Sequence, residues 1–249
     1  MRIALCLSGG LRNFKDTYHT FKHFLLDKHD VDLFFYGLEN KEGKTQNQKD
    51  LISIYNARSF QVNDELQYSE IECKYPIKSS YYSFYNVMKC NDLKIAYEKE
   101  NNFKYDLVIR SRTDYFWFRE LSQFELLTSK NKIILPQEWS FKCVNPIALT
   151  DAFAVGSSEL MDQYSLLFNN IDRYCLNVPF HPETLCGWHL NTNNIPYHEH
   201  QRCVIFEYPS KRIEKYITPY KFIRYFDDDM DISEETDYLL SRSNKRKNF

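Results

Sequence analysis

Charged side chains directly follow the clearest strand-like segment of the sequence, residues 105–111. Arg110 lies within this apolar segment, and Arg112, Thr113 and Asp114 come at its end. Burying a guanidinium or a carboxylate costs free energy unless the group is paired or used, so the cluster predicts either an ion pair or a binding site. Guanidinium groups and a carboxylate-held Mg²⁺ or Mn²⁺ both neutralise phosphate charge, which makes a bound diphosphate the chemistry that this cluster suits best.

A second candidate site is the turn Ser8-Gly9-Gly10, which ends the apolar run of residues 2–8. Glycines let a backbone approach a ligand closely, and the N-terminus of a following helix favours an anion. Arg12 adds a guanidinium for a phosphate. The turn also resembles the phosphate loop of ATP pyrophosphatases, but this chain lacks the acidic residue that follows in that family. A tight turn without a ligand is the alternative.

Two downstream acidic residues are candidates for a general base. Asp151 precedes an apolar strand at residues 152–156, and Glu183 lies in the first turn of a predicted helix at 182–191. A transferase that inverts the anomeric centre needs a carboxylate within hydrogen-bond reach of the acceptor hydroxyl. The helix dipole also favours an acid near a helix start, which is the alternative explanation for Glu183. The sequence leaves the choice between the two residues open.

His198 and His200 follow a strand-like segment at residues 195–197. Alternate positions of a strand place both imidazoles on one face, where they can complete a metal site. A solvent-facing pair is the alternative.

The periodicity of apolar residues predicts the scaffold that must position these side chains. Strands at 2–8 and 31–37 flank a helix at 14–27, which is a βαβ opening, and a long helix at 80–101 leads into the strand at 105–111. Further strands are expected at 59–62, 132–135, 152–156 and 203–208, and further helices at 51–57, 157–169 and 182–191. This alternation predicts an α/β fold with a mostly parallel sheet flanked by helices. Ligands then bind beyond the carboxyl ends of the strands, here after Leu7, Tyr36, Ile109 and Val155.

The 249 residues suit a single domain, which we expect at 1–208, followed by a C-terminal wrapping segment at 209–249. The net charge of -2 argues against a nucleic-acid partner. The 7 cysteines are scattered and indicate reduced thiols rather than a zinc site.

Nothing in the sequence approaches the roughly 20 apolar residues of a transmembrane segment, and the first apolar run is too short for a signal peptide. We therefore expect a cytoplasmic protein. The basic and aromatic stretch 211–224 suits contact with a membrane surface, near a lipid-linked acceptor.

Four blocks of the sequence resemble, in the same order, a family of glycosyltransferases that build bacterial and viral surface polysaccharides. They are residues 2–14, 105–114, 151–157 and 181–183, and the similarity covers roughly residues 1–200. The resemblance implies a GT-A (Rossmann-like) fold, a nucleoside-diphosphate sugar as donor, and Mn²⁺ or Mg²⁺ at an Asp-x-Asp-like position.

In this chain that motif reads Arg112-Thr113-Asp114, so its first acidic residue is absent. Asp114 is then the sole carboxylate ligand, or Arg112 replaces part of the cation's charge. A late histidine sometimes joins the metal in GT-A enzymes, which makes His198 and His200 further candidate ligands.

The leading hypothesis is therefore metal-assisted transfer of a hexose or pentose from a nucleoside-diphosphate sugar to a glycan acceptor. The base would lie near residues 7–12, the diphosphate and metal at Asp114, and the acceptor above Asp151 and Glu183. One alternative is another nucleotide-binding enzyme, either a nucleotidyltransferase or an enzyme like the ATP pyrophosphatases. Another is a non-catalytic glycan-binding module, which would bind glycan without nucleotide. The sequence does not predict the donor sugar, the acceptor or the oligomeric state.

Overall fold

In the computed structural model, the first apolar run forms β1 (Arg2–Gly10), a strand with a neighbour on each side. It pairs in parallel with β2 (Asp30–Leu38) and with β4 (Leu107–Ser111). The structure describes residues 1–11, 14–38, 48–63, 71–117, 119–137, 145–200 and 205–207. The expected wrapping segment at 209–249 lies outside these residues.

Seven strands form the main sheet in the order β3-β2-β1-β4-β7-β6-β8. The remaining members are β3 (Ser59–Asn63), β6 (Ile133–Pro136), β7 (Ala154–Gly156) and β8 (Tyr197–His200). Only β7 runs antiparallel to its neighbours among the described pairs of this sheet. The mostly parallel α/β architecture is confirmed. The chain builds outward from β1 to β3 and then crosses to β4, so the order of the strands reverses between β1 and β4.

The direction of β7 corrects one prediction. Ala154 pairs with Arg110 and Gly156 pairs with Val108. The last residue of β7 therefore lies beside the beginning of β4. The segment that reaches the carboxyl ends of β1 and β4 is therefore the one before β7, at Asp151, and not the one after Val155 as expected.

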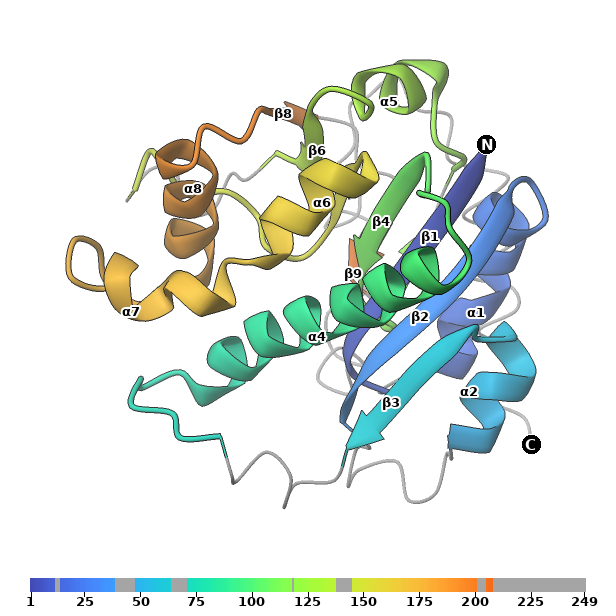
Figure 1. The fold of residues 1–249 in the computed structure, drawn as a ribbon, viewed down its shortest axis with the longest axis horizontal. Helices are drawn as coiled ribbons and strands as arrows, with labels where there is room; N and C mark the ends of the chain where they lie inside the picture. Colours follow the sequence, from blue (N-terminus) through green and yellow to red (C-terminus); the bar gives the residue numbers. More distant parts are fainter. Residues whose placement is uncertain are drawn as a thin grey trace, which may run out of the picture.

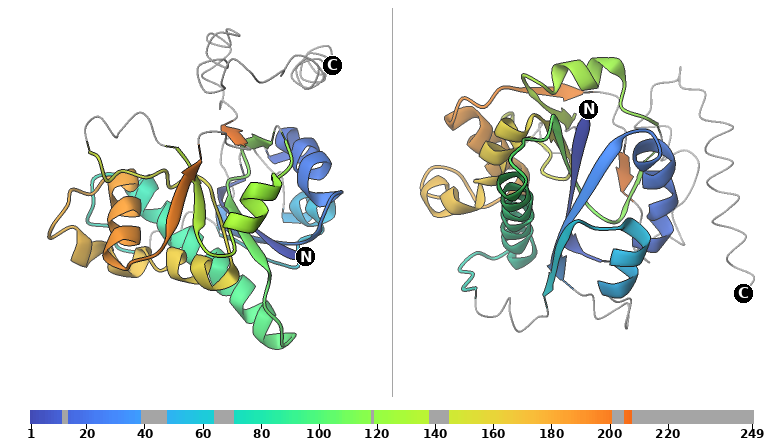
Figure 2. Two further views of the ribbon diagram at one scale, coloured as in Figure 1. Left: turned by 90° about the horizontal axis from the view of Figure 1, so that it is seen from above. Right: turned by 45° about the vertical axis from the view of Figure 1, so that its right-hand side comes forward.

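Helices cover both faces of the sheet (Figure 1). In the right-hand view of Figure 2, α1 (Phe14–Phe21) and α2 (Gln48–Tyr55) lie on one side, and the long α4 (Lys78–Glu100) lies on the other with α6 (Ser158–Ser165). The other helical elements are η1 (Lys22–Leu26), α5 (Gln123–Thr128), η3 (Phe168–Asn170), α7 (Ile171–Tyr174) and α8 (Pro182–Thr192). Of the described helices, none is both long and apolar enough to cross a membrane.

Alternating residues of β1 fill two separate cores, because successive side chains of a strand point to opposite faces. Leu5 packs with Phe14 of α1 on one face, whereas Cys6 packs with Phe84 and Val87 of α4 on the other. The two faces of the sheet are therefore fully covered where β1 and β4 meet.

A two-stranded sheet lies apart from the main one and contains β5 (Tyr115–Trp117) and β9 (Ile205–Glu207). The strand expected at 203–208 thus forms, but it pairs outside the main sheet. The sequence did not predict β5. Trp117 is completely buried and lies against Phe21 and Phe153, with ring centroids 5.7 and 5.8 Å away.

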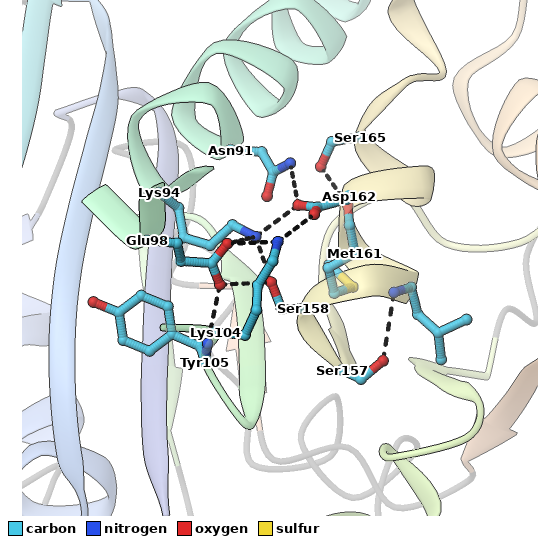
Figure 3. A network of polar contacts seen from close by, with 11 residues as sticks. Asn91, Lys94, Glu98, Lys104, Tyr105, Ser157, Ser158, Met161, Asp162 and Ser165 are labelled. Carbon is cyan, nitrogen blue, oxygen red and sulfur yellow. Dashed lines mark hydrogen bonds and ion pairs between the residues drawn. The ribbon is translucent and has the colours of Figure 1, made fainter. Parts of the chain in front are cut away.

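The inner face of α4 is more polar than its apolar pattern predicts, and a buried ionic network occupies its second half (Figure 3). The Nζ atom of Lys94 lies 2.6 Å from Asp162 of α6 and 2.7 Å from Ser158. Glu98 accepts hydrogen bonds from the Nζ atom of Lys104 at 2.9 Å and from the amide of Tyr105 at 3.0 Å. Buried charges are tolerated when they are paired in this way, and the pairing joins α4 to α6 and to the start of β4.

Candidate functional site

A pocket of about 360 Å³ lies where β1, β2 and β4 end. This is the edge at which ligands bind in open α/β sheets, next to the point where the strand order reverses. It contains most of the residues that the sequence analysis identified: Ser8, Gly9, Gly10, Arg110, Arg112, Asp114 and Asp151. Leu38, Ala152, Pro182 and five residues of α4 (Ser79, Ser80, Tyr82, Ser83 and Asn86) complete its lining.

The glycine turn of β1 forms one side of the pocket. Gly9 has φ 108°, a backbone conformation that residues with a Cβ atom rarely adopt. Its register partner is Gly37 of β2, where an added Cβ would lie only 1.7 Å from the carbonyl oxygen of Gly9. The hydroxyl of Thr113 donates to the carbonyl of Gly10 at 2.8 Å. The turn after β4 is thereby fastened to the turn after β1.

Arg112 and Asp114 form a bidentate ion pair. The Nε and Nη2 atoms of Arg112 lie 2.9 and 2.7 Å from the two carboxylate oxygens of Asp114. Asp114 is 1% exposed. The guanidinium carbon of Arg112 also lies 5.0 Å from the ring centroid of Tyr115. The ion pair considered as the alternative for this cluster is therefore present.

Arg110 and Ser8 have polar atoms that the described protein leaves without a partner. Arg110 is 2% exposed and donates from one terminal nitrogen to the carbonyl of Ala152, but its Nε atom has no hydrogen-bond partner. Ser8 is 3% exposed, and its Oγ atom also has none. Such atoms are rare in folded proteins and cost roughly 1–3 kcal/mol each, so each one calls for a partner such as a water molecule, an ion or a ligand.

The N-terminal turns of α4 form another side of the pocket, which the sequence analysis treated only as scaffold. Ser79, Ser83 and Asn86 recur at the spacing of one helix face and all line the pocket. The N-cap residue, Ile77, provides no side-chain hydrogen bond to the helix. A cluster of serines at the start of a predicted helix was the available signal. Only the fold shows that this helix begins beside the strand ends.

The two candidate bases are placed differently. Asp151 lines the pocket and is partly exposed. Glu183 begins α8 as expected, and its carboxylate lies 3.4 Å from the Nε2 atom of His181. Glu183 is not among the described residues that line the pocket, although its neighbour Pro182 is.

His198 and His200 lie on one face of β8, as their spacing predicts. Their ring centroids are 5.5 and 5.6 Å from that of Phe124, and the Nε2 atom of His200 is 3.9 Å from Glu125. β8 is three strands away from β4 in the sheet order, roughly 14 Å at ordinary strand spacing. The structure does not bring the two histidines to Asp114.

The divalent cation that we expected has no preformed group of protein ligands among the described residues. Within them, no three histidine, cysteine, aspartate or glutamate side chains gather in a way that could hold a metal ion. Both oxygens of Asp114 accept hydrogen bonds from Arg112, so a cation would compete with a buried guanidinium for them. Arg12, expected to bind phosphate, lies outside the described residues.

No curated protein matches the chain. A family model described as a domain of unknown function, DUF7796, matches residues 1–205. This range includes every strand of the main sheet and every residue that lines the pocket. The chain therefore belongs to the DUF7796 family.

Proposed function

We propose that the protein is a glycosyltransferase that moves a sugar from a nucleoside-diphosphate sugar to a glycan acceptor. The observation that carries the proposal is the pocket beside β1 and β4, which combines two guanidinium groups with a carboxylate at the position where α/β sheets bind ligands. Transfer from such a donor leaves a diphosphate, whose growing negative charge must be stabilised. The resemblance of residues 2–14, 105–114, 151–157 and 181–183 to surface-polysaccharide glycosyltransferases supports the same reaction.

The proposed reaction needs one base and one anion site. The acceptor hydroxyl oxygen bonds to the anomeric carbon while the bond from that carbon to the diphosphate oxygen breaks. The electron pair of the broken bond leaves with the diphosphate, and Asp151 takes the proton of the acceptor hydroxyl. Asp151 suits this role better than Glu183, because Asp151 lines the pocket and Glu183 lies beside His181.

Nucleotidyl transfer is a second candidate function, and one observation favours it. Asp114 and Asp151 line the same pocket, and pairs of carboxylates are common where nucleotides are joined to sugars through metal ions. The two reactions release different products. Sugar transfer releases a nucleoside diphosphate, whereas nucleotidyl transfer releases pyrophosphate.

Thermal unfolding with and without nucleotides tests whether the pocket binds the donor. We expect UDP, GDP or CMP, or a corresponding nucleotide-sugar, to stabilise the protein in EDTA as well as in Mn²⁺. A ligand at about 100 times its dissociation constant stabilises the native state by roughly 2.7 kcal/mol. If no nucleotide or nucleotide-sugar raises the melting temperature in either condition, the proposed function is wrong.

Hydrolysis of the bound donor, with water in place of the unknown acceptor, tests the role of Asp151. We expect Asp151→Asn to lower turnover by roughly 10²- to 10⁴-fold at an unchanged donor affinity, because it removes a general base. Glu183→Gln is the matched control and should retain most of the activity. The opposite ranking of the two variants would assign the base to Glu183.

A further inference from the structure

The wall of the pocket formed by α4 has the properties of an anion site. α4 is 23 residues long and begins at Lys78 without a side-chain cap. The first amides of a helix carry about half a positive charge. In α4 the amide of Ser80 already donates to the carbonyl of Ile77 at 3.1 Å, which leaves the amides of Lys78 and Ser79 as the donors at the helix start. Ser79 and Ser80 are in this first turn, and Ser83 follows one turn later on the pocket side.

Two further groups, from residues that line both this pocket and a smaller neighbouring one, suit the same class of ligand. The Nε–H of Arg110 is only a donor, and the Ser8 hydroxyl can donate as well. Both lack a partner and both are more than nine-tenths buried. The amides at the start of α4 are donors too. A ligand that satisfies all of these groups must be rich in acceptor atoms and carry no donor at these positions, which describes an oxyanion.

The local charge beside Arg110 favours a phosphate, although the carboxylate of Asp151 lines the same pocket. Arg112 is neutralised by its bidentate contact with Asp114. Arg110 forms no ion pair with any described residue, and its terminal nitrogen contacts only the neutral carbonyl of Ala152. A buried guanidinium without a counter-ion is costly, so an anionic ligand beside it gains strongly.

We propose that this part of the pocket is the diphosphate subsite of the sugar donor, formed by the N-terminus of α4 together with Ser8 and Arg110. This assignment rests on the glycosyltransferase function proposed above, and it differs from the sequence-based expectation that placed the diphosphate on a cation at Asp114. Donors on two sides of the pocket, α4 on one side and the ends of β1 and β4 on the other, suit a ligand with two anionic groups. Here Arg110 and the helix N-terminus supply the positive charge.

Ser80→Asp provides a direct test. An acidic side chain at the third position of a helix is favoured by the helix dipole, so this variant should fold and be as thermally stable as the original protein or more so. The same carboxylate repels a diphosphate bound at the helix start. We expect calorimetric titration in EDTA to show UDP or GDP, whichever binds, at least about tenfold weaker in this variant. Ser8→Ala should weaken binding by roughly three- to tenfold through the loss of one hydrogen bond.

Ser53→Asp is the matched control, because Ser53 is exposed on α2 and does not line the pocket. It adds the same charge and should leave the affinity within about twofold, since salt screens distant surface charges. Nucleoside monophosphate, pyrophosphate and inorganic phosphate are titrated alongside. The diphosphate and pyrophosphate should bind more tightly than the two ligands with a single phosphate.

The outcomes separate this inference from the proposed function. Nucleotide-sugar binding that Ser80→Asp and Ser8→Ala leave unchanged would overturn the subsite and keep the glycosyltransferase proposal. Pyrophosphate binding that depends on Ser80 and Ser8, without any nucleotide binding, would overturn the donor assignment and leave a simple oxyanion site. Affinity for UDP or GDP that disappears in EDTA would also overturn the subsite, because it would return the diphosphate to a metal ion.

Discussion

Arg112 and Asp114 show at the scale of single residues how an ion pair occupies the atoms that a metal ion would use. The carboxylate is almost completely buried, and each of its oxygens accepts a hydrogen bond from the guanidinium. The hydroxyl of Thr113, between them, bonds the carbonyl of Gly10. The pair therefore holds the turn that connects the ends of β1 and β4.

Asp114→Asn is expected to destabilise the protein by about 1–3 kcal/mol, because an amide keeps the shape of the side chain but leaves the guanidinium of Arg112 without its counter-charge. The free energy of unfolding in urea measures the loss. Asp92→Asn is the control, since Asp92 is 53% exposed in its pair with Lys89 and should cost roughly 0–1 kcal/mol. Equal losses in the two variants would show that the buried pair does not hold the turn.

At the scale of elements, the backbones of β1 and β2 approach each other closely beside the pocket. Gly9 and Gly37 are partners in the register, and the carbonyl of Gly9 occupies the space where a side chain on residue 37 would begin. The strand ends that line the pocket therefore depend on a glycine that the sequence analysis used only as the end of a strand.

Gly37→Ala is expected to destabilise the protein by roughly 1–3 kcal/mol, because the added Cβ would overlap the backbone of Gly9 and push the two strands apart. It should also weaken nucleotide binding, because Gly9 lines the pocket. Urea unfolding and nucleotide titration measure the two effects. Gly156→Ala is the control: its Cβ would lie 3.3 Å from the flexible side chain of Met161, and β7 ends at the other edge of the sheet. A similar loss in both variants would contradict the close approach of β1 and β2.

Apolar periodicity predicted the elements that carry the site, and it missed features that depend on packing. β1, β2 and β4 form where expected, because continuous apolar runs are typical of buried parallel strands. The direction of β7 could not be predicted, since the short apolar run at 152–156 fits either direction. Lys94 of α4 is buried although it is charged, because Asp162 and Ser158 of α6 satisfy it.

The candidate site, like the fold, was predicted in part. Ser8 and Arg110 were identified because the carboxyl ends of parallel strands lie together, and Asp151 was identified as an acidic residue before a strand. The structure places all three in one pocket. Ser79 and Ser80 were not identified as site residues. Their place in the pocket depends on where the connection after β3 puts the start of α4, which no local pattern shows. The separation of His200 from Asp114 likewise follows from the strand order, which no local pattern contains.

At the scale of the whole molecule, two buried acidic groups join elements that are distant in sequence. Glu98 connects α4 with β4 and α6, and Asp32 of β2 accepts hydrogen bonds from Tyr105 and Arg58. Burial alone would raise the pKa of both carboxyls. Their hydrogen bonds and the neighbouring cations outweigh burial, so the pKa of each lies below its ordinary value.

This arrangement predicts the response to acid. A carboxyl whose pKa is lower in the folded than in the unfolded protein stabilises the fold fully above its unfolded pKa, which is about 4. That stability is lost as the pH falls through the lower, folded pKa. We therefore expect the free energy of unfolding to decrease as the pH falls from about 5 to below 4.

Urea unfolding between pH 7 and pH 3 measures this change. Glu98→Gln should be less stable at pH 7 and should lose part of the decrease in acid, because its amide does not titrate. Glu100→Gln, at an exposed position at the end of α4, should follow the original protein. An unchanged pH dependence in Glu98→Gln would show that Glu98 does not contribute to it.

The pairing of β1 with β4 has a consequence for synthesis of the protein. Ile3 pairs with Leu107, so one edge of β1 has no partner until about a hundred residues later in the chain have been made. At roughly 5–20 residues per second, this apolar edge stays open on the ribosome for about 5–20 s, and an open edge can pair with a strand of another chain. The strand edge that later supports the pocket is therefore also open to misassembly while the chain is still incomplete.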